Sequence, residues 1–254
     1  MDVRETTWVI TGGAGGIGSA LARQVIADGA SAVVIADLDE ERIGVVAEDI
    51  GAIGVACDVT DEESVQALVD LVLTKHGPVD VFSSNAGSSV DGGLEVPDDD
   101  WQVLWDLHVM AHVYAARAVT PSMKAAGGGY LLQTVSAAGL LASLTSLPYT
   151  VTKTASLSLA EWLAITHKAD NIRVSAVCPM VVETPLIARF ALDAGPGPAM
   201  STEDLAEIIV QGVRDEVFLI LPHPEVGEYV ERKMSDRDRW LSGMSRLWEK
   251  ASRG

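Results

Sequence analysis

The sequence predicts an α/β fold in which one doubly wound parallel sheet carries helices on both faces. Short runs that are apolar at every position alternate with segments of helical periodicity, and strands that are apolar throughout belong in a parallel sheet covered on both sides. A glycine cluster, Gly12 to Gly18, separates the first such run from the first helical segment. Because no repeat, low-complexity tract or linker interrupts the chain, residues 1–254 are expected to form one domain.

The first elements follow from local signals. The β-rich run Thr7–Thr11 is ended by the glycine cluster, and the helix after it ends at Asp28-Gly29. The apolar run Ala32–Ala36 is ended by Asp37. The same reasoning predicts strands at Ile53–Cys57, Val79–Ser83, Tyr130–Val135, Ile172–Cys178 and Val217–Leu221. It predicts helices at Glu40–Asp49, Asp61–Gly77, Trp101–Met123 and Tyr149–Thr166, and a C-terminal helical extension over residues 222–254.

Two turn-rich segments, Ser88 to Asp100 and Asp193 to Met200, interrupt the alternation and are not expected to form regular elements. Each follows a strand on the side where open α/β sheets bind ligands. They are therefore either ordinary surface loops or parts of a substrate lid.

The composition excludes several classes of protein. Hydrophobic residues make up 48% of the chain, which excludes a disordered protein. With 18 Lys+Arg against 36 Asp+Glu the net charge is −18, which disfavours nucleic acid and anionic membranes as partners. The two cysteines, Cys57 and Cys178, cannot form a disulfide framework. Since no signal peptide or membrane-spanning run is evident, we expect a cytoplasmic protein.

The glycine cluster is the first candidate binding site. It reads as Gly13-x-Gly15-x-x-Gly18 or as Thr11-Gly12-x-x-x-Gly16-x-Gly18, and it lies between a strand and a helix. Such a turn lets backbone N–H groups approach a pyrophosphate without interference from a Cβ atom. Asp37 ends the second strand, where its carboxylate can accept hydrogen bonds from both adenosine ribose hydroxyls and repel a 2′-phosphate. Since residues 13–19 and Leu38 carry no cation, NAD is favoured over NADP.

Tyr149 and Lys153 form the second candidate site. Residues four apart share one helical face, and an ammonium beside a phenol favours the phenolate, which suits proton transfer. Ser136 follows a strand 13 residues earlier, where its hydroxyl could hold a substrate oxygen as charge develops on it.

These motifs together resemble the short-chain dehydrogenases/reductases of the short, single-domain, NAD-dependent type, from about Thr7 to Leu221. The resemblance rests on the following motifs: Thr11-Gly12-x-x-x-Gly16-x-Gly18, Asp58, Asn85-Ala86-Gly87, Ser136, Tyr149-x3-Lys153 and Pro179…Thr184. It implies a Rossmann fold with a seven-stranded parallel sheet. It also implies that Tyr149 is the general acid/base, that Lys153 binds the nicotinamide ribose and lowers the pKa of the tyrosine, and that Ser136 positions the substrate oxygen.

The resemblance also implies a set of cofactor contacts. Asp58 would contact the adenine amino group, and Asn85-Ala86-Gly87 would line the adenine ribose and stabilise the sheet. Val182 and Thr184 would contact the carboxamide of the nicotinamide. The full set of expected cofactor residues is Gly12, Gly16, Ile17, Gly18, Asp37, Leu38, Asp58, Val59, Asn85, Ala86, Gly87, Tyr149, Lys153, Val182 and Thr184.

Three positions depart from the family pattern. Ser84 replaces an asparagine, and Met180 replaces the usual glycine, which would bring a large side chain near the nicotinamide. His108 stands where the family has the asparagine that kinks a helix and holds a relay water. An imidazole titrates near ~6.5, so His108 is either a substitute proton relay or a spectator. His108-x3-His112 also has metal-ligand spacing, but no third ligand is evident and no metal is expected.

The predicted function is an NAD-dependent oxidoreductase that interconverts a secondary alcohol and a ketone. An NADPH-dependent 3-oxoacyl thioester reductase and a catalytically weak NAD-binding regulatory or scaffold protein remain the alternatives. The turn-rich segments hold no basic cluster, since Ser88 to Asp100 has no cation and Arg189 stands alone between Pro185 and Met200. An apolar or alicyclic substrate is expected in a pocket formed by Leu140, Leu141, Leu144, Leu147, Met180 and Leu186.

Two further expectations concern assembly. In the relatives the helices corresponding to Trp101–Met123 and to the one after Tyr149 pair across subunits, which implies a homotetramer or homodimer. The segment after Pro224 carries Val226, Val230, Met234, Leu241, Met244 and Trp248 at helical spacing, and it is expected to dock on its own subunit.

Overall fold

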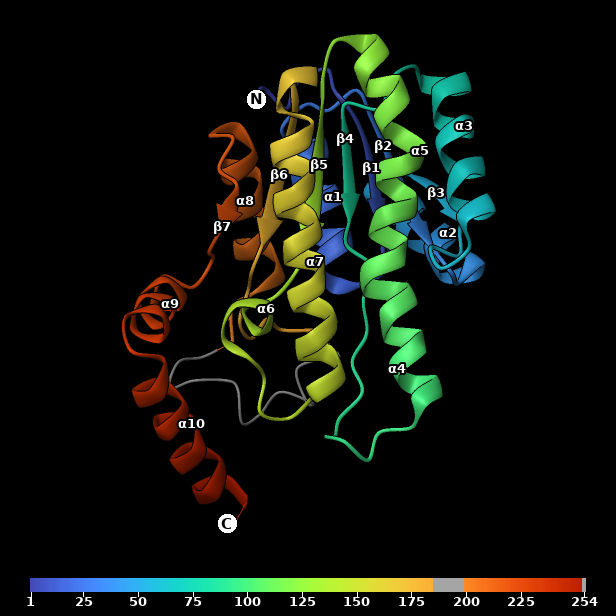
Figure 1. Ribbon diagram of the computed structural model, residues 1–254. Coiled ribbons are helices and arrows are strands. Elements are labelled where there is room, and N and C mark those ends of the chain that lie inside the picture. Colours follow the sequence, from blue (N-terminus) through green and yellow to red (C-terminus); the bar gives the residue numbers. More distant parts are fainter. Residues whose placement is uncertain (185–198, 253–254) are drawn as a thin grey trace.

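A computed structural model describes residues 1–184 and 199–252 of the chain. The central element is a seven-stranded, entirely parallel sheet with the strand order β3-β2-β1-β4-β5-β6-β7 (Figure 1). Its strands are β1 (Thr7–Thr11), β2 (Ala32–Asp37), β3 (Ile53–Ala56), β4 (Val81–Ser84), β5 (Gly129–Thr134), β6 (Ile172–Val177) and β7 (Leu219–Ile220). The predicted doubly wound, Rossmann-type sheet is therefore confirmed.

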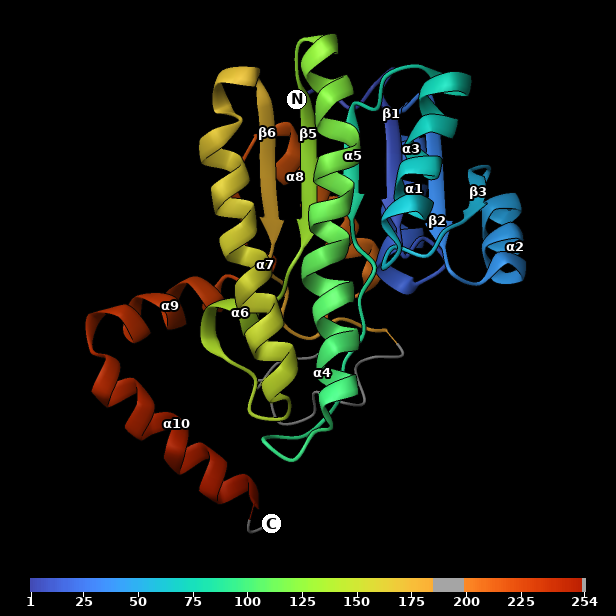
Figure 2. The same cartoon turned by 45° about the vertical axis from the view of Figure 1, so that its right-hand side comes forward.

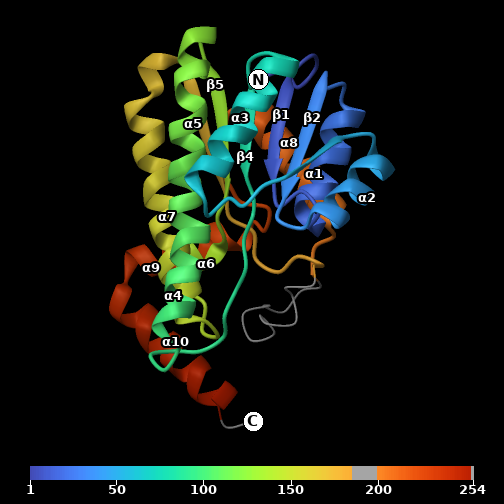
Figure 3. The ribbon, with the colours of Figure 1, turned by 90° about the vertical axis from the view of Figure 1, so that its right-hand side faces the viewer.

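The helices cover both faces of this sheet. They are α1 (Gly16–Ala27), α2 (Glu40–Ile50), α3 (Glu62–His76), α4 (Asp98–Trp105), the π-helix η1 (Asp106–Met110), α5 (Ala111–Ala126), α6 (Ala137–Leu141), α7 (Leu147–Thr166), the short 3₁₀ turn η2 (Lys168–Asp170), α8 (Thr202–Arg214), α9 (Glu225–Ser235) and α10 (Arg237–Ser252). One face packs against α1, α2 and α8, and the other against α3, α5 and α7 (Figure 3). Each face buries its own apolar core cluster.

Capping residues set several helix starts. The Asp39 carboxylate accepts a hydrogen bond from the Arg42 amide and caps α2, as Asp61 does for α3 with the Glu63 amide. Ser146 caps α7 in the same way, and its hydroxyl accepts from the amide of Tyr149 at 3.2 Å. This cap fixes where α7 begins and hence where Tyr149 lies.

Several expected boundaries were wrong. Residues 98–100, assigned to an irregular segment, form the first turn of α4, because three carboxylates there complement the positive end of the helix dipole. The helix expected over 101–123 is three consecutive segments, with a π-helical turn at Asp106–Met110. Met200 forms an isolated bridge with Val182, whereas residues 193–198 lie outside the described residues.

Two helices, α6 and α8, were not predicted from the sequence. α8 follows Ser201, whose hydroxyl caps it by accepting from the Asp204 amide at 3.0 Å. Its apolar face is fully buried against α1. The short α6 follows Ser136, which caps it through the Ala138 amide at 3.1 Å.

The C-terminal extension consists of two helices, α9 and α10. They meet at Asp236, whose extended backbone (φ −151°, ψ 91°) ends α9. α9 packs on α6, while α10 packs on α9 and projects away from the sheet (Figure 2). No helix within the described residues combines the length and the apolar character that crossing a membrane requires.

Candidate active site

The candidate site lies at the carboxyl edge of the sheet, where the strand order reverses between β1 and β4. In open α/β sheets this switch point opens a crevice for ligands. The crevice here is a cavity of about 1190 Å³. Ser136 and every residue predicted to bind the cofactor line it, from the glycine turn to Val182 and Thr184. Among the residues expected to take part in catalysis or cofactor binding, only His108 is absent from the lining.

The glycine turn leaves room for a ligand at the start of α1. Gly12 has a φ of +64°, and a Cβ atom there would lie 2.8 Å from the Cα of Ala86. A Cβ atom on Gly18 would lie 2.3 Å from the Gly12 carbonyl oxygen. Gly15, which precedes α1, has no side chain to cap the helix, so the first N–H groups of α1 remain for an outside acceptor. This part of the cavity fits a pyrophosphate.

Asp37 is held rigidly at the cavity wall. Its Oδ2 accepts from the Ala14 amide at 3.0 Å and its Oδ1 from the Leu38 amide at 2.9 Å. The carboxylate is thereby tied to the glycine turn, and its remaining lone pairs can accept from ribose hydroxyls. The structure also brings Arg42, on the first turn of α2, to the lining of the same cavity. This cation was not predicted from the sequence, because only the charges of the turn and of Leu38 bore on that prediction.

Asn85 forms hydrogen bonds that link the ends of β1, β4 and β5. Its Nδ2 donates to the Thr11 carbonyl at 3.0 Å, and its Oδ1 accepts from the Thr134 hydroxyl at 3.1 Å. The hydroxyl of Thr11 accepts in turn from the amides of Asn85 and Ala86. Asp58 forms a turn in which its Oδ1 accepts from the amide of Thr60 at 2.9 Å. The bonds of Asn85 and Thr11 keep the ends of β1, β4 and β5 in register around the cavity.

Tyr149, Lys153 and Ser136 line the same cavity, the first two from α7 and Ser136 from the end of β5 at the cap of α6. Lys153 is buried, its Nζ donates to the Thr134 carbonyl at 2.9 Å, and it lies 5.7 Å from the centre of the Tyr149 ring. Burial lowers the pKa of Lys153 to about 8, so its ammonium keeps its charge at neutral pH. Tyr149 and Ser136 are also buried. The arrangement brings a cation beside a phenol and a hydroxyl at one cavity wall.

His108 lies behind this wall, in the π-helical turn. Its Nε2 accepts from the Ser88 amide at 3.3 Å, which places the ring proton on Nδ1, 2.9 Å from the Thr152 hydroxyl. The ring packs edge-on against that of Tyr149, with centroids 5.4 Å apart. Burial, together with the charge of Lys153, lowers the pKa of His108 well below its usual value. The expected titration near 6.5 is therefore wrong, because the buried imidazole stays neutral.

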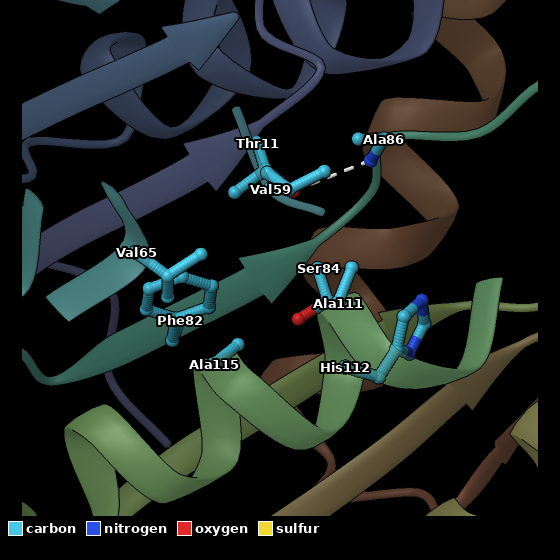
Figure 4. Close-up of a pocket in the computed structure, with 9 residues that line it drawn as sticks. All are labelled: Thr11, Val59, Val65, Phe82, Ser84, Ala86, Ala111, His112 and Ala115. Carbon is cyan, nitrogen blue, oxygen red and sulfur yellow. Dashed lines mark hydrogen bonds between the residues drawn. The ribbon is translucent and has the colours of Figure 1, made fainter. Parts of the chain in front are cut away.

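His112, one turn further along, is fully buried beside a small cavity of about 10 Å³, the space of a single water (Figure 4). Burial lowers its pKa to about 3. Neither ring nitrogen has a well-placed hydrogen-bond partner among the described residues. Within residues 1–184 and 199–252 no three His, Cys, Asp or Glu side chains are arranged to hold a metal ion.

The far half of the cavity differs from the pocket expected from the sequence. Leu141, Leu144 and Met180 line it, whereas Leu140 and Leu147 do not and Leu186 lies outside the described residues. Lining residues from α4, η1 and the loop after α6 were not predicted: Val103, Leu107, Ala142 and Ser143. It also missed a wall contributed by α9 and α10: Tyr229, Arg232, Trp240, Met244 and Leu247. The helical stripe in the C-terminal segment was the available signal, but only tertiary packing shows which cavity it faces.

The comparisons with known proteins agree with this architecture. The family model for short chain dehydrogenases matches residues 6–194. The chain is 30% identical to 1-deoxy-11-beta-hydroxypentalenate dehydrogenase of Streptomyces exfoliatus, over 95% of this chain and 92% of that protein. It is 33% identical to the mitochondrial (-)-isopiperitenol/(-)-carveol dehydrogenase of Mentha piperita, over 85% and 89% of the two chains.

A solved structure extends the likeness to the fold. A short-chain dehydrogenase/reductase from Burkholderia phymatum, in complex with NAD, superposes with a TM-score of 0.87 at 26% identity. The match covers 94% of this chain and 96% of that one. The family model, the relatives and this structure agree with one another, and the chain belongs to the short-chain dehydrogenase/reductase family.

Proposed function

We propose that this oxidoreductase interconverts a secondary alcohol and a ketone with NAD as its cofactor. The observation that carries the proposal is that Ser136, Tyr149 and Lys153 line the same cavity as the glycine turn and Asp37. Nothing in a purely binding or scaffold role requires a buried lysine beside a tyrosine and a serine at that point. The relatives named above are called dehydrogenases, one of a hydroxypentalenate and one of isopiperitenol and carveol, which supports the reaction class.

The residues present fit the nicotinamide cofactor. The first turn of α1 would hold the pyrophosphate, Asp37 the adenosine ribose and Lys153 the nicotinamide ribose. When bound, the nicotinamide supplies hydride transfer to or from the carbinol carbon. In the direction of oxidation Tyr149 takes the hydroxyl proton, and the positive charge of Lys153 favours the phenolate that accepts it. The Ser136 hydroxyl holds the substrate oxygen as its charge changes.

The choice of NAD is tested by titrating the protein with NADH and with NADPH while following nicotinamide fluorescence. We expect tighter binding of NADH, because the Asp37 carboxylate accepts from ribose hydroxyls and repels a 2′-phosphate. Asp37→Asn should weaken NADH binding about tenfold, since charged hydrogen bonds contribute about 1.5–3 kcal/mol. Asp39→Asn is the matched control, because an asparagine still caps α2.

A preference for NADPH would refute the NAD assignment. Arg42 would then be the first residue to test, since it lines the cavity and could face a 2′-phosphate. Such a result would favour the alternative of a 3-oxoacyl thioester reductase. Binding of neither cofactor would favour the scaffold alternative.

We propose that His108 positions the site and does not carry protons to solvent. Both ring nitrogens are engaged, and the ring links the Ser88 amide to α7 while packing on Tyr149. His108→Asn, which keeps a donor and an acceptor, should retain wild-type turnover, whereas His108→Ala should lower kcat about tenfold. The pH profile from 5.5 to 7.5 should be the same for wild type and His108→Asn. If kcat of the wild type instead changed near pH 6.5 and this change were absent in His108→Asn, His108 would be a proton relay that titrates in this range.

Assembly and location stay predictions. Val103 and Trp105 on α4 and Val151, Trp162 and Ile165 on α7 expose apolar surface, which supports the expected homotetramer or homodimer. Light scattering on the purified protein would give its mass in solution. A cytoplasmic location rests on the sequence considerations alone.

The substrate is tested by a screen of secondary alcohols with NAD, monitored by NADH formation. The apolar lining from Val103, Leu107, Leu141, Leu144 and Met180 favours an alcohol with an apolar or alicyclic body. Activity confined to thioester substrates would contradict this substrate class.

A further inference from the structure

The cavity wall formed by α9 and α10 is apolar and aromatic except for one charged side chain, that of Arg232. Among the described residues, the charged side chains that line the cavity are Asp37, Arg42, Asp58, Lys153 and Arg232. The first three lie at the adenosine end and Lys153 belongs to the catalytic cluster. Arg232 alone comes from the C-terminal extension, where its neighbours on the wall are Tyr229, Trp240, Met244 and Leu247.

α9 is fixed to the body of the protein on either side of this arginine. Val226, near its start, is completely buried. The Lys233 ammonium, next to Arg232 in sequence, donates to the Leu140 carbonyl of α6 at 2.5 Å. Because α9 is held at both ends, the side chain of Arg232 is presented to the cavity from a defined backbone position.

Neighbouring side chains orient the guanidinium of Arg232 but leave some of its N–H donors for a ligand. It stacks 5.6 Å from the centre of the Tyr229 ring, and that ring lies 6.5 Å from the ring of Trp240 on α10. Its Nη2 donates to Glu228 at 3.1 Å, with both side chains about two-thirds exposed. An exposed pair of this kind contributes about 0–1 kcal/mol, so an incoming anion can compete for the arginine or use its other donors.

We infer that the substrate combines an apolar, ring-sized body with one anionic group such as a carboxylate, and that Arg232 binds the anionic group. This inference rests on the proposed function, because it names the substrate class of the same cavity. In a chain of net charge −18 an anionic substrate needs such a local cation to offset the general repulsion. The aromatic pair Tyr229 and Trp240 contacts the body next to that group.

The test is calorimetric binding of cyclohexanecarboxylate and of its methyl ester, with and without NADH. We expect the acid to bind wild-type protein about tenfold more tightly than the ester, since charge-assisted hydrogen bonds are stronger than neutral ones. Arg232→Met should remove this preference. Arg237→Met, which removes the same charge from a residue that does not line the cavity, should keep it. Glu228→Gln should strengthen binding of the acid, because it frees the guanidinium.

Three outcomes would overturn the inference. Wild type could bind acid and ester equally, it could bind neither, or the preference for the acid could survive in Arg232→Met. A second measurement distinguishes failure of this inference from failure of the proposed function. It compares the turnover of 4-hydroxycyclohexanecarboxylate with that of its methyl ester, with NAD as the cofactor. An acid preference in binding without oxidation of either alcohol would mean that the proposed reaction is wrong while the anion site stands. Oxidation of both alcohols with equal kcat/KM would mean that the proposed reaction stands while the anion site is wrong.

Discussion

Tyr149→Phe is expected to lower turnover by about 10³-fold or more while leaving NADH binding intact. The substitution removes only the phenolic oxygen, so the ring still packs against His108 and next to Lys153. The proton of the substrate hydroxyl then has no acceptor, and general acid/base catalysis of this kind contributes about 10²–10⁴-fold. The measurement is kcat for oxidation of an alcohol found in the screen, with nicotinamide fluorescence reporting cofactor binding.

Tyr114→Phe is the matched control, because it removes the same atom from a tyrosine on α5 that does not line the cavity. It should behave as wild type. Turnover by Tyr149→Phe within a few-fold of wild type would show that another group exchanges the proton. Loss of NADH binding in that variant would show that the effect is structural and would not support the assigned role.

Lys153→Met is expected to lower kcat about 10²-fold or more and to change its pH dependence. Methionine keeps a long apolar side chain in the buried site but removes the charge that favours the phenolate. The acidic limb of the oxidation profile should therefore move to higher pH. In wild type the ammonium, with a pKa of about 8, loses its proton as the pH rises through that value, so a decline is expected above pH 8. The variant should lack that decline.

Cofactor binding should weaken as well in Lys153→Met, because the ammonium is the proposed ribose contact. Lys168→Met removes an exposed lysine that follows the end of α7 and does not line the cavity, so it should change neither kcat nor the pH profile. If Lys153→Met kept the wild-type pH profile with only a lower kcat, the lysine would have a purely structural role.

Much of the nucleotide half of the cavity could be predicted from the sequence because its residues are local to strand ends. Gly12 to Gly18 follow β1, Asp37 ends β2 and Asn85 follows β4, so a parallel sheet brings them to one edge without further information. The same holds for Ser136 after β5. For Tyr149 and Lys153 helical spacing adds that both side chains share one face of α7.

The protonation state of His108 could not be predicted from the sequence. Its position relative to the family pattern could be read from the sequence, and so could the two roles open to an imidazole there. The protonation state depends on burial and on which group each ring nitrogen meets, here the Ser88 amide and the Thr152 hydroxyl, which lie 20 and 44 residues away. Those contacts exist only once α7 and the loop after β4 have packed against the π-helical turn.

The sequence by itself determined the alternation of elements, the switch point and the strand-end residues that line the crevice there, because these follow from hydrophobic period, turn chemistry and the geometry of parallel strands. The tertiary structure alone decided the neutral state of His108, the presence of Arg42 at the adenosine end and the wall that Arg232 and the α10 residues build over the substrate half. Each of these depends on contacts between segments distant along the chain, and such contacts leave no periodic signal in the residues that make them.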